Sequence, residues 1–206
     1  MKPGWTRRTC GVLALLSLLA VPGTSLAAGS EDPDWPCVQR RVPEVSAGMV
    51  WAGPPLEELQ QDWRQVPEVS QLAGKIAARR TELEAAKAAV ADFAAGLGAD
   101  RSEKLTLLFA GTLTIVNRDR ASILSGIERF TRKQRALADR ISETAAKLKA
   151  LPADAAAQRE ELEQQRLWDT RIYEDREKSL TYICEQPVLL EQRIFALSRE
   201  IMGHLE

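Results

Sequence analysis

Residues 101–150 read RSEKLTLLFAGTLTIVNRDRASILSGIERFTRKQRALADRISETAAKLKA, and this segment dominates the architecture of the chain. Its apolar residues recur in alternating steps of three and four, which places them on one face of a helix and is typical of a coiled-coil seam. No proline interrupts the pattern, so we predict one long helix from Arg101 to Ala150. The seam consists of Val116, Ile123, Ile127, Phe130, Leu137, Ile141 and Leu148.

One part of this helix, Leu105–Val116, carries no charge and also fits a buried strand, because threonine, isoleucine and valine favour β structure. The run is continuous with the helical period, and no second strand pattern accompanies it. We therefore expect a helix that is buried on most sides.

A first long helix is predicted upstream, from Glu68 to Gly96. Its apolar residues follow the same three-four steps, and Arg79 is the one polar break in the seam. Gly96 and Gly98 are placed to end the helix as C-caps. The seam residues are Leu72, Ile76, Leu83, Ala86, Val90, Phe93 and Leu97.

A third helix is predicted after Leu151-Pro152-Ala153-Asp154, where the proline stops one helix and the aspartate would cap the next. It reaches Gln186, and Pro187 then removes one backbone donor, so we expect a kink there. A single seam continues across the proline, which favours a bent continuation over a turn. That seam is Leu180, Ile183, Pro187, Leu190, Ile194, Leu197 and Ile201.

We expect the chain to reverse direction at Gly98 and again at Pro152. The three helices then form an all-α fold whose base is a three-helix antiparallel bundle. The first helix covers only part of the second, so beyond about Phe130 the other two would project as a two-helix coiled-coil hairpin. Residues equally far from Pro152 should face each other in it, which places Phe130 near Tyr173 or Glu174.

The beginning of the chain predicts export. A positively charged start, the apolar run Gly11–Val21 and small residues after it form the secretory signal pattern. We predict that residues 1–28 are a cleaved signal peptide of a periplasmic protein, because the run is shorter than the roughly 20 residues that a retained membrane anchor needs. Residues 29–67 are rich in proline and should form an extended strap with one short helix, Leu56–Gln65. The bundle and hairpin occupy residues 68–206.

Two cysteines, Cys37 and Cys184, follow the predicted signal peptide. Thiols pair in an oxidising compartment, so we predict a disulfide between the strap and the last helix; the alternative is two separate buried thiols. The bond would close a loop of nearly 150 residues, for which loop entropy allows roughly 4–5 kcal/mol of stabilisation. No C-x-x-C motif is present, so we expect a structural role.

Composition and motifs predict no catalytic residue, cofactor or metal site. The 28 basic and 29 acidic residues nearly balance, so the overall charge does not indicate nucleic acid. The single histidine, His204, has no second ligand in view, and the serines lie in helical patterns without a base nearby. We expect a protein that is not an enzyme and does not span a membrane once the signal peptide is cleaved.

Two features of the predicted hairpin are candidates for interaction. A basic cluster on the second helix could bind an acidic protein or a phosphate-bearing envelope polymer, or it could pair with acidic residues of the facing helix. Trp168 falls where one partner helix alone can cover it, so it is either a seam residue or a partly exposed contact anchor. The basic cluster consists of Arg129, Arg132, Lys133 and Arg135.

The start of the predicted mature chain resembles that of exported proteobacterial proteins of uncharacterised function. The matching residues are Asp34-Trp35-Pro36-Cys37-Val38-Gln39 and Val50-Trp51-Ala52-Gly53-Pro54. This resemblance covers about twenty residues and implies no activity. In outline alone, a base with a protruding hairpin is similar to periplasmic holdase chaperones of the Skp/OmpH type. That family has a β-rich body, whereas this chain shows no strand pattern.

These patterns favour a periplasmic interaction protein that uses its hairpin to bind a protein partner or an envelope polymer, as scaffold, adaptor or chaperone. A second hypothesis is a small-ligand sensor with an apolar pocket in the base, formed by Leu105–Val116, the tryptophans and the kink at Pro187. Heptad seams pair either within one chain or between chains, so the sequence is also consistent with a homo-oligomer.

Overall fold

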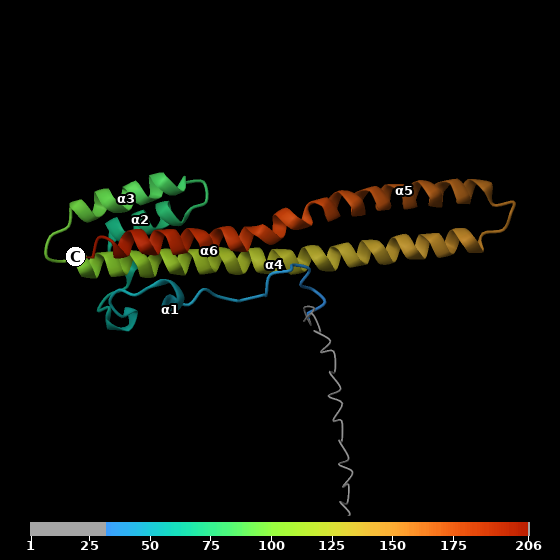
Figure 1. Ribbon diagram of the computed structural model, residues 1–206. Coiled ribbons are helices and arrows are strands. Elements are labelled where there is room, and N and C mark those ends of the chain that lie inside the picture. Colours follow the sequence, from blue (N-terminus) through green and yellow to red (C-terminus); the bar gives the residue numbers. More distant parts are fainter. Residues whose placement is uncertain (1–31, 206) are drawn as a thin grey trace, which may run out of the picture.

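The computed structural model describes residues 32–205, and every regular element in this part of the chain is helical. The all-α prediction is confirmed. The long helix α4 (Arg101–Ala150) is continuous, and the other elements pack along it (Figure 1). The run that also fitted a strand, Leu105–Val116, is helical and contains most of the buried residues of α4. The predicted signal peptide, residues 1–28, lies outside the described residues.

The first predicted helix is divided in two, which corrects the sequence analysis. Helix α2 (Pro67–Ala77) ends where Ala78 becomes extended (φ −62°, ψ 127°), and α3 (Leu83–Ala95) begins after a short turn. In that turn the Thr81 hydroxyl donates to the Lys75 carbonyl at 2.8 Å, which satisfies one of the carbonyls left without a helical partner at the end of α2.

Because of this division, four helices longer than one turn form the base within residues 32–205, where three were predicted. Helix α2 runs in the same direction as the start of α4, with Glu68 paired to Lys104 at 3.0 Å, and α3 folds back beside α6 (Leu180–Met202) (Figure 1). Arg79, the polar break in the predicted seam, lies in the turn and is exposed. A continuous helix would carry this charge along the core-facing seam, where burial without a partner is costly.

The third predicted helix is divided at Ser179 and not at Pro187. Ser179 separates α5 (Ala156–Lys178) from α6, although it keeps helical angles (φ −81°, ψ −12°). Pro187 lies buried inside α6. A proline inside a helix costs about 3 kcal/mol, and burying its apolar ring in the base offsets part of that cost.

The core of the base is built on the uncharged part of α4. Residues that it buries completely include Leu105, Leu107, Leu108 and Phe109. Trp51 of the strap stacks on Phe109, with ring centroids 4.1 Å apart. Gly111 lets neighbouring segments come close, because a Cβ atom there would lie 2.8 Å from the Trp63 ring and 3.1 Å from the Ala73 methyl group.

The Pro-rich segment forms the predicted strap and runs along α4 (Figure 1). It contains one helical turn, α1 (Ala47–Val50), and two 3-10 turns, η1 (Leu56–Glu58) and η2 (Trp63–Gln65). The short helix expected for residues 56–65 is therefore two separate turns. The Asp62 side chain starts the second of them by accepting a backbone N–H at 2.8 Å.

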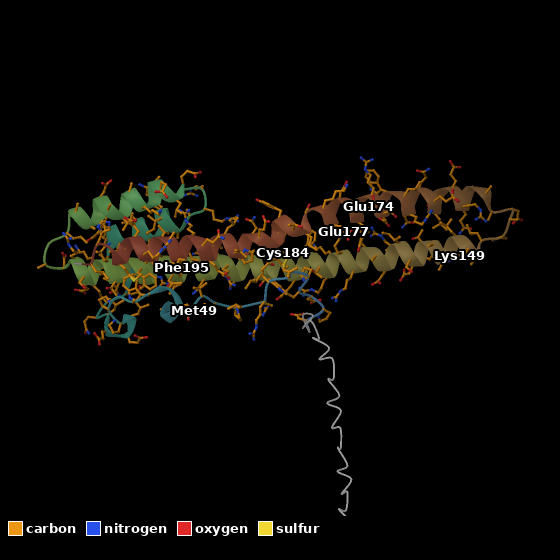
Figure 2. All side chains as sticks on the ribbon, in the orientation of Figure 1. Met49, Lys149, Glu174, Glu177, Cys184 and Phe195 are labelled. Carbon is orange, nitrogen blue, oxygen red and sulfur yellow. A yellow bond between two sulfur atoms is a disulfide. The ribbon has the colours of Figure 1, made fainter. Side chains whose placement is uncertain are left out.

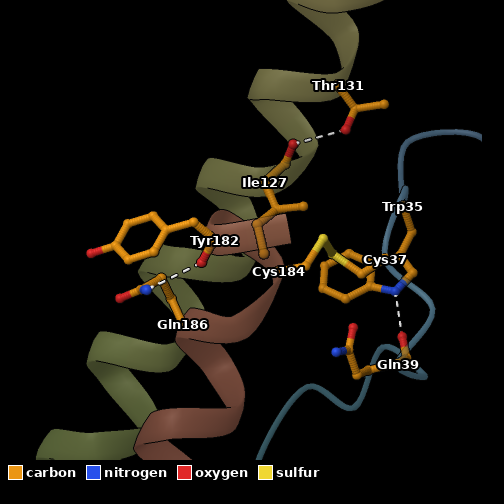
Figure 3. The surroundings of a disulfide bond; sticks show 8 residues. All are labelled: Trp35, Cys37, Gln39, Ile127, Thr131, Tyr182, Cys184 and Gln186. Atoms are coloured by element: carbon orange, nitrogen blue, oxygen red, sulfur yellow. Dashed lines mark hydrogen bonds between the residues drawn. A yellow bond between two sulfur atoms is a disulfide. The ribbon is translucent and has the colours of Figure 1, made fainter. Parts of the chain in front are cut away.

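The strap is tied to the bundle where the base ends and the hairpin begins. Cys37 and Cys184 form the predicted disulfide, with their Cα atoms 5.5 Å apart (Figure 3). Trp35 packs beside it against Ile127 of α4, and its indole donates to the Gln39 carbonyl at 2.7 Å. We call this second, smaller core the junction cluster. It consists of Trp35, Cys37, Leu124, Ile127 and Cys184.

Beyond the junction cluster, α4 and α5 extend as the predicted hairpin, and no other described helix accompanies them (Figure 1). Their connection spans residues 151–155, with Ala155 rather than Asp154 at the N-cap position of α5. Within residues 32–205 we find no helix with the length and apolar character needed to cross a lipid bilayer.

Candidate functional site

The hairpin is held together by fewer apolar contacts than the base. Helix α5 buries a single residue, Asp169, and the part of α4 that faces it buries Leu137 and Thr144. Figure 2 shows Lys149 near the tip of this pair and Glu174 on α5 closer to the base. Most side chains of the hairpin therefore meet solvent.

The main polar link across the hairpin is an ion pair between Arg140 of α4 and Asp169 of α5. The Arg140 Nε atom donates to one carboxylate oxygen at 2.7 Å and Nη2 donates to the other at 2.5 Å. This bidentate geometry is the strong and specific form of the arginine–carboxylate interaction. Asp169 is only 4% exposed, and its hydrogen bond raises the pKa of Arg140 above the ordinary value. Nearer the base, the Gln134 amide donates to the Tyr173 carbonyl at 3.0 Å.

The predicted basic cluster divides into two pairs that face different ways. Arg132 and Arg135 both bind Asp34 of the strap, and Arg132 Nη1 lies 2.7 Å from its carboxylate. Arg135 also donates to the Pro33 carbonyl at 3.1 Å. The hydrogen bond from Arg132, together with the charge of Arg135, lowers the pKa of Asp34 below its ordinary value. These two arginines anchor the strap, a partner that the sequence analysis did not consider.

The other pair, Arg129 and Lys133, is exposed and has no acidic partner within residues 32–205. Lys133 lines an open hollow of about 260 Å³ together with Arg140, Ile172 and Arg176. Because Arg140 is already engaged in its ion pair, the uncompensated charges at this hollow are those of Lys133 and Arg176.

Trp168 extends this surface towards the tip of the hairpin. Its side chain is 64% exposed, so it is not a buried seam residue, and the neighbouring Leu167 is 58% exposed. Trp168, Ile172 and Arg176 follow one another in steps of four, which places them on one face of α5. We call the combined surface the hairpin face. It consists of Arg129, Lys133, Arg140, Trp168, Ile172 and Arg176.

Arg120, which the sequence analysis missed, holds the strap to the base. Its side chain is 2% exposed, its Nε donates to Glu191 of α6 at 2.9 Å, and its Nη1 donates to the carbonyls of Val42 and Pro43. A buried guanidinium needs such partners because an unpaired buried charge is strongly unfavourable. A signal was present in the sequence, since Arg120 lies four residues after Val116 and so shares its helix face.

The interior that the sensor hypothesis assigned to a ligand is occupied by side chains of the protein. Trp51 lies on Phe109, and Trp63 lies against Gly111. The hollows of the base are instead open at its surface. One of about 210 Å³ lies between the strap and α6, where Met49 and Phe195 are exposed (Figure 2).

The described surfaces offer a ligand side-chain donors, charges and aromatic rings. Within residues 32–205, no group of three or more His, Cys, Asp or Glu side chains is arranged to hold a metal ion. His204 lies 3.1 Å from Glu200 on the last turn of α6. Comparison with known proteins found no matching family model, no matching curated protein and no matching solved structure.

Proposed function

We propose that this protein is an interaction protein that binds a partner protein through the hairpin face, as scaffold, adaptor or chaperone. The observation that carries the proposal is that α5 packs on α4 without a third helix and leaves Trp168 exposed on the same helix face as the unpaired Arg176. Helices draw most of their stability from tertiary packing. The parts of α4 and α5 that extend away from the core therefore add little to the stability of the protein. They instead place an accessible surface at a distance from the base.

The chemistry of the hairpin face favours an acidic partner that also carries an apolar group. Lys133 and Arg176 have no counter-ion within the described residues, and Arg129 lies one turn before Lys133 on α4, towards the base. Tryptophan and arginine are the residue types that most often anchor protein interfaces. A partner segment whose carboxylates lie to one side of an apolar side chain would neutralise the charges, which are on the base side of Trp168, and cover its indole.

We place this interaction in the periplasm. The secretory pattern of residues 1–28 supports that location, as does the Cys37–Cys184 disulfide, because disulfides persist in oxidising compartments. An envelope polymer with phosphate groups would neutralise the same positive charges, so the experiment must distinguish such a polymer from a protein partner.

Site-specific photo-crosslinking tests the proposal. A benzophenone amino acid at position 167, beside Trp168, should crosslink one partner protein, whereas the same group at position 195 in the base should not. The partner, once purified, should bind the protein directly and lose about thirtyfold in affinity with Trp168→Ala, the loss typical of an aromatic hot spot. The double variant Lys133→Glu with Arg176→Glu should weaken binding further at low salt.

Phe195→Ala is the matched control for the tryptophan variant. Phe195 is an exposed aromatic residue, 48% accessible, and the Arg199 guanidinium lies 5.2 Å from its ring, so it offers similar chemistry on the base. An equal loss of affinity from both variants would mean that the hairpin face is not the binding site.

A deletion separates the hairpin from the base. Joining residue 138 to residue 171 through a short loop keeps Arg132 and Arg135, which hold the strap, and removes Arg140, Trp168 and the tip. Undiminished partner binding by this variant would refute the proposal. Adducts of twice the chain mass would identify a second copy as the partner, and displacement by polyphosphate but not by polyglutamate would identify an anionic polymer.

A further inference from the structure

A second surface feature lies in the base, where the turn between α2 and α3 approaches α6. A hollow of about 520 Å³ opens there. Figure 3 shows two of its lining residues, Tyr182 and Gln186, pointing away from the disulfide and therefore away from the strap. The charged and apolar residues of the lining are Arg79, Arg80, Leu83, Tyr182, Leu189 and Arg193.

Arg193 lacks an acceptor for part of its guanidinium group. Its Nε atom donates to the Ile76 carbonyl at 2.8 Å, whereas Nη2 is buried and has no hydrogen-bond acceptor in the described part of the chain. Burial lowers the pKa of Arg193 below its ordinary value, and the charge of Glu82 acts in the opposite direction. An unpaired donor on a charged group is costly to bury, and the Arg193 side chain also lines the hollow, so an anion bound there would lie next to a positive charge that the protein itself does not neutralise.

Two further guanidinium groups line the same hollow. Arg79 donates to the Gln186 side chain, and Arg80 is exposed with no acidic partner within residues 32–205. The carboxylate whose charge acts on Arg193 is that of Glu82 alone. The hollow is therefore positively charged, and apolar walls strengthen its attraction for an anion because they lower the local dielectric.

The remaining walls are apolar and accessible. Leu83 is half-buried at the start of α3, while Tyr182 and Leu189 of α6 are 66% and 49% exposed. Large apolar side chains left open beside a cationic group are typical of sites that bind a ligand with both an apolar and a charged part. The volume also falls within the range of small-molecule sites, roughly 300–1,000 Å³.

We propose that this hollow binds an amphipathic anion, a single carboxylate or phosphate group carried on an apolar chain. The head group would accept hydrogen bonds from Arg193 and Arg80, and the chain would cover Tyr182 and Leu189. Because Arg193 also binds the end of α2 through the Ile76 carbonyl, an occupied site would link α2 to α6. The site shares no residue with the hairpin face, so a negative result for one proposal does not affect the other.

Isothermal titration of the disulfide-bonded protein with octanoate and with octyl phosphate tests this inference, and the comparison separates a carboxylate from a phosphate head group. At least one probe should bind and should shift the NMR resonance of the Arg193 Nε–H group. Arg193→Gln should weaken binding by roughly tenfold, because it removes charged hydrogen-bond donors from a half-buried side chain. Arg80→Gln should weaken it by about threefold, since that side chain is exposed.

Arg199→Gln is the matched control, because Arg199 lies on the same helix and stacks on Phe195 outside the hollow. It should leave the affinity for both probes unchanged. If Arg193→Gln does not fold, Arg80→Gln still tests the site, because Arg80 is exposed and makes no polar contact with residues 32–205 that its loss would break. Equal binding of 1-octanol would overturn the role of charge, and equal binding of inorganic phosphate would overturn the role of the apolar walls. No heat and no NMR shift with either probe at millimolar concentration would overturn the site itself.

Discussion

The base and the hairpin share one helix, α4, and yet they are stabilised in different ways. In the base, Leu105, Leu107 and Leu108 of α4 have no exposed surface, because neighbouring helices and the strap cover them. In the hairpin, the only side chain that α5 buries is Asp169, which is held by Arg140. The contrast teaches that what a helix packs against, more than its own propensity, determines how firmly it is held.

This difference has a consequence for function. Regions with few buried apolar contacts open at a lower free energy than the core does. The base thus has the larger buried core, while the hairpin keeps Trp168 and its basic neighbours accessible. An equally well-packed hairpin would have buried the indole and left no apolar anchor for a partner.

The largest expected effect comes from the same substitution made in both regions. Leu108→Ala in the base should lower the free energy of unfolding by about 4 kcal/mol, because a fully buried leucine leaves a cavity. Leu162→Ala on α5 should lower it by about 1 kcal/mol, since Leu162 is half-buried. Urea unfolding followed by circular dichroism measures both values. Similar losses would show that the hairpin has a core as important as that of the base.

The next effect concerns the junction between the two regions. Replacing Cys37 and Cys184 with serine should cost about 3 kcal/mol, because the bond closes a loop with a sequence separation of 147 residues and measured losses are commonly smaller than the loop-entropy value. Hydrogen exchange should then increase in the strap around Trp35, while α5 exchanges as before. The reduced wild-type protein is the control and should behave like the variant. Faster exchange throughout α5 would mean that the hairpin depends on the strap.

The smallest effect is a loosening of the strap in acid. The pKa of Asp34 is lowered from its ordinary value of 3.8, chiefly by the hydrogen bond from Arg132. Its contribution to stability is therefore complete above that ordinary value and is lost as the pH falls through the lower, folded-state pKa. The NMR resonance of the Trp35 indole N–H, which bonds to Gln39, reports the change. Asp34→Asn should abolish this titration, and an unchanged titration in that variant would assign it to another group.

The hairpin face could be predicted only in part. The lengths of the helices leave Trp168 with a single partner helix, which is consistent with a seam residue and with a partly exposed contact anchor, and the structure shows it exposed. The basic cluster was different: nothing in the local sequence separates Arg132 and Arg135, which bind the strap, from Arg129 and Lys133, which do not. That separation depends on the path of a segment some hundred residues away, which brings Asp34 to one side of α4.

Residue patterns along the chain were enough to predict the all-α class, the full length of α4, the projection and the disulfide. These features follow from apolar periodicity, from the absence of proline in residues 101–150 and from a pair of cysteines, all of which are local or compositional. The helix breaks and the register were set by contacts between distant segments. The chain divides at Ser179 while Pro187 stays helical in the packed base. Phe130 and Tyr173 line one hollow, as expected, and the Tyr173 carbonyl accepts its hydrogen bond from Gln134, about one turn along α4 from Phe130. Periodicity carries no information about which distant side chains meet, so packing and polar pairing decide such details.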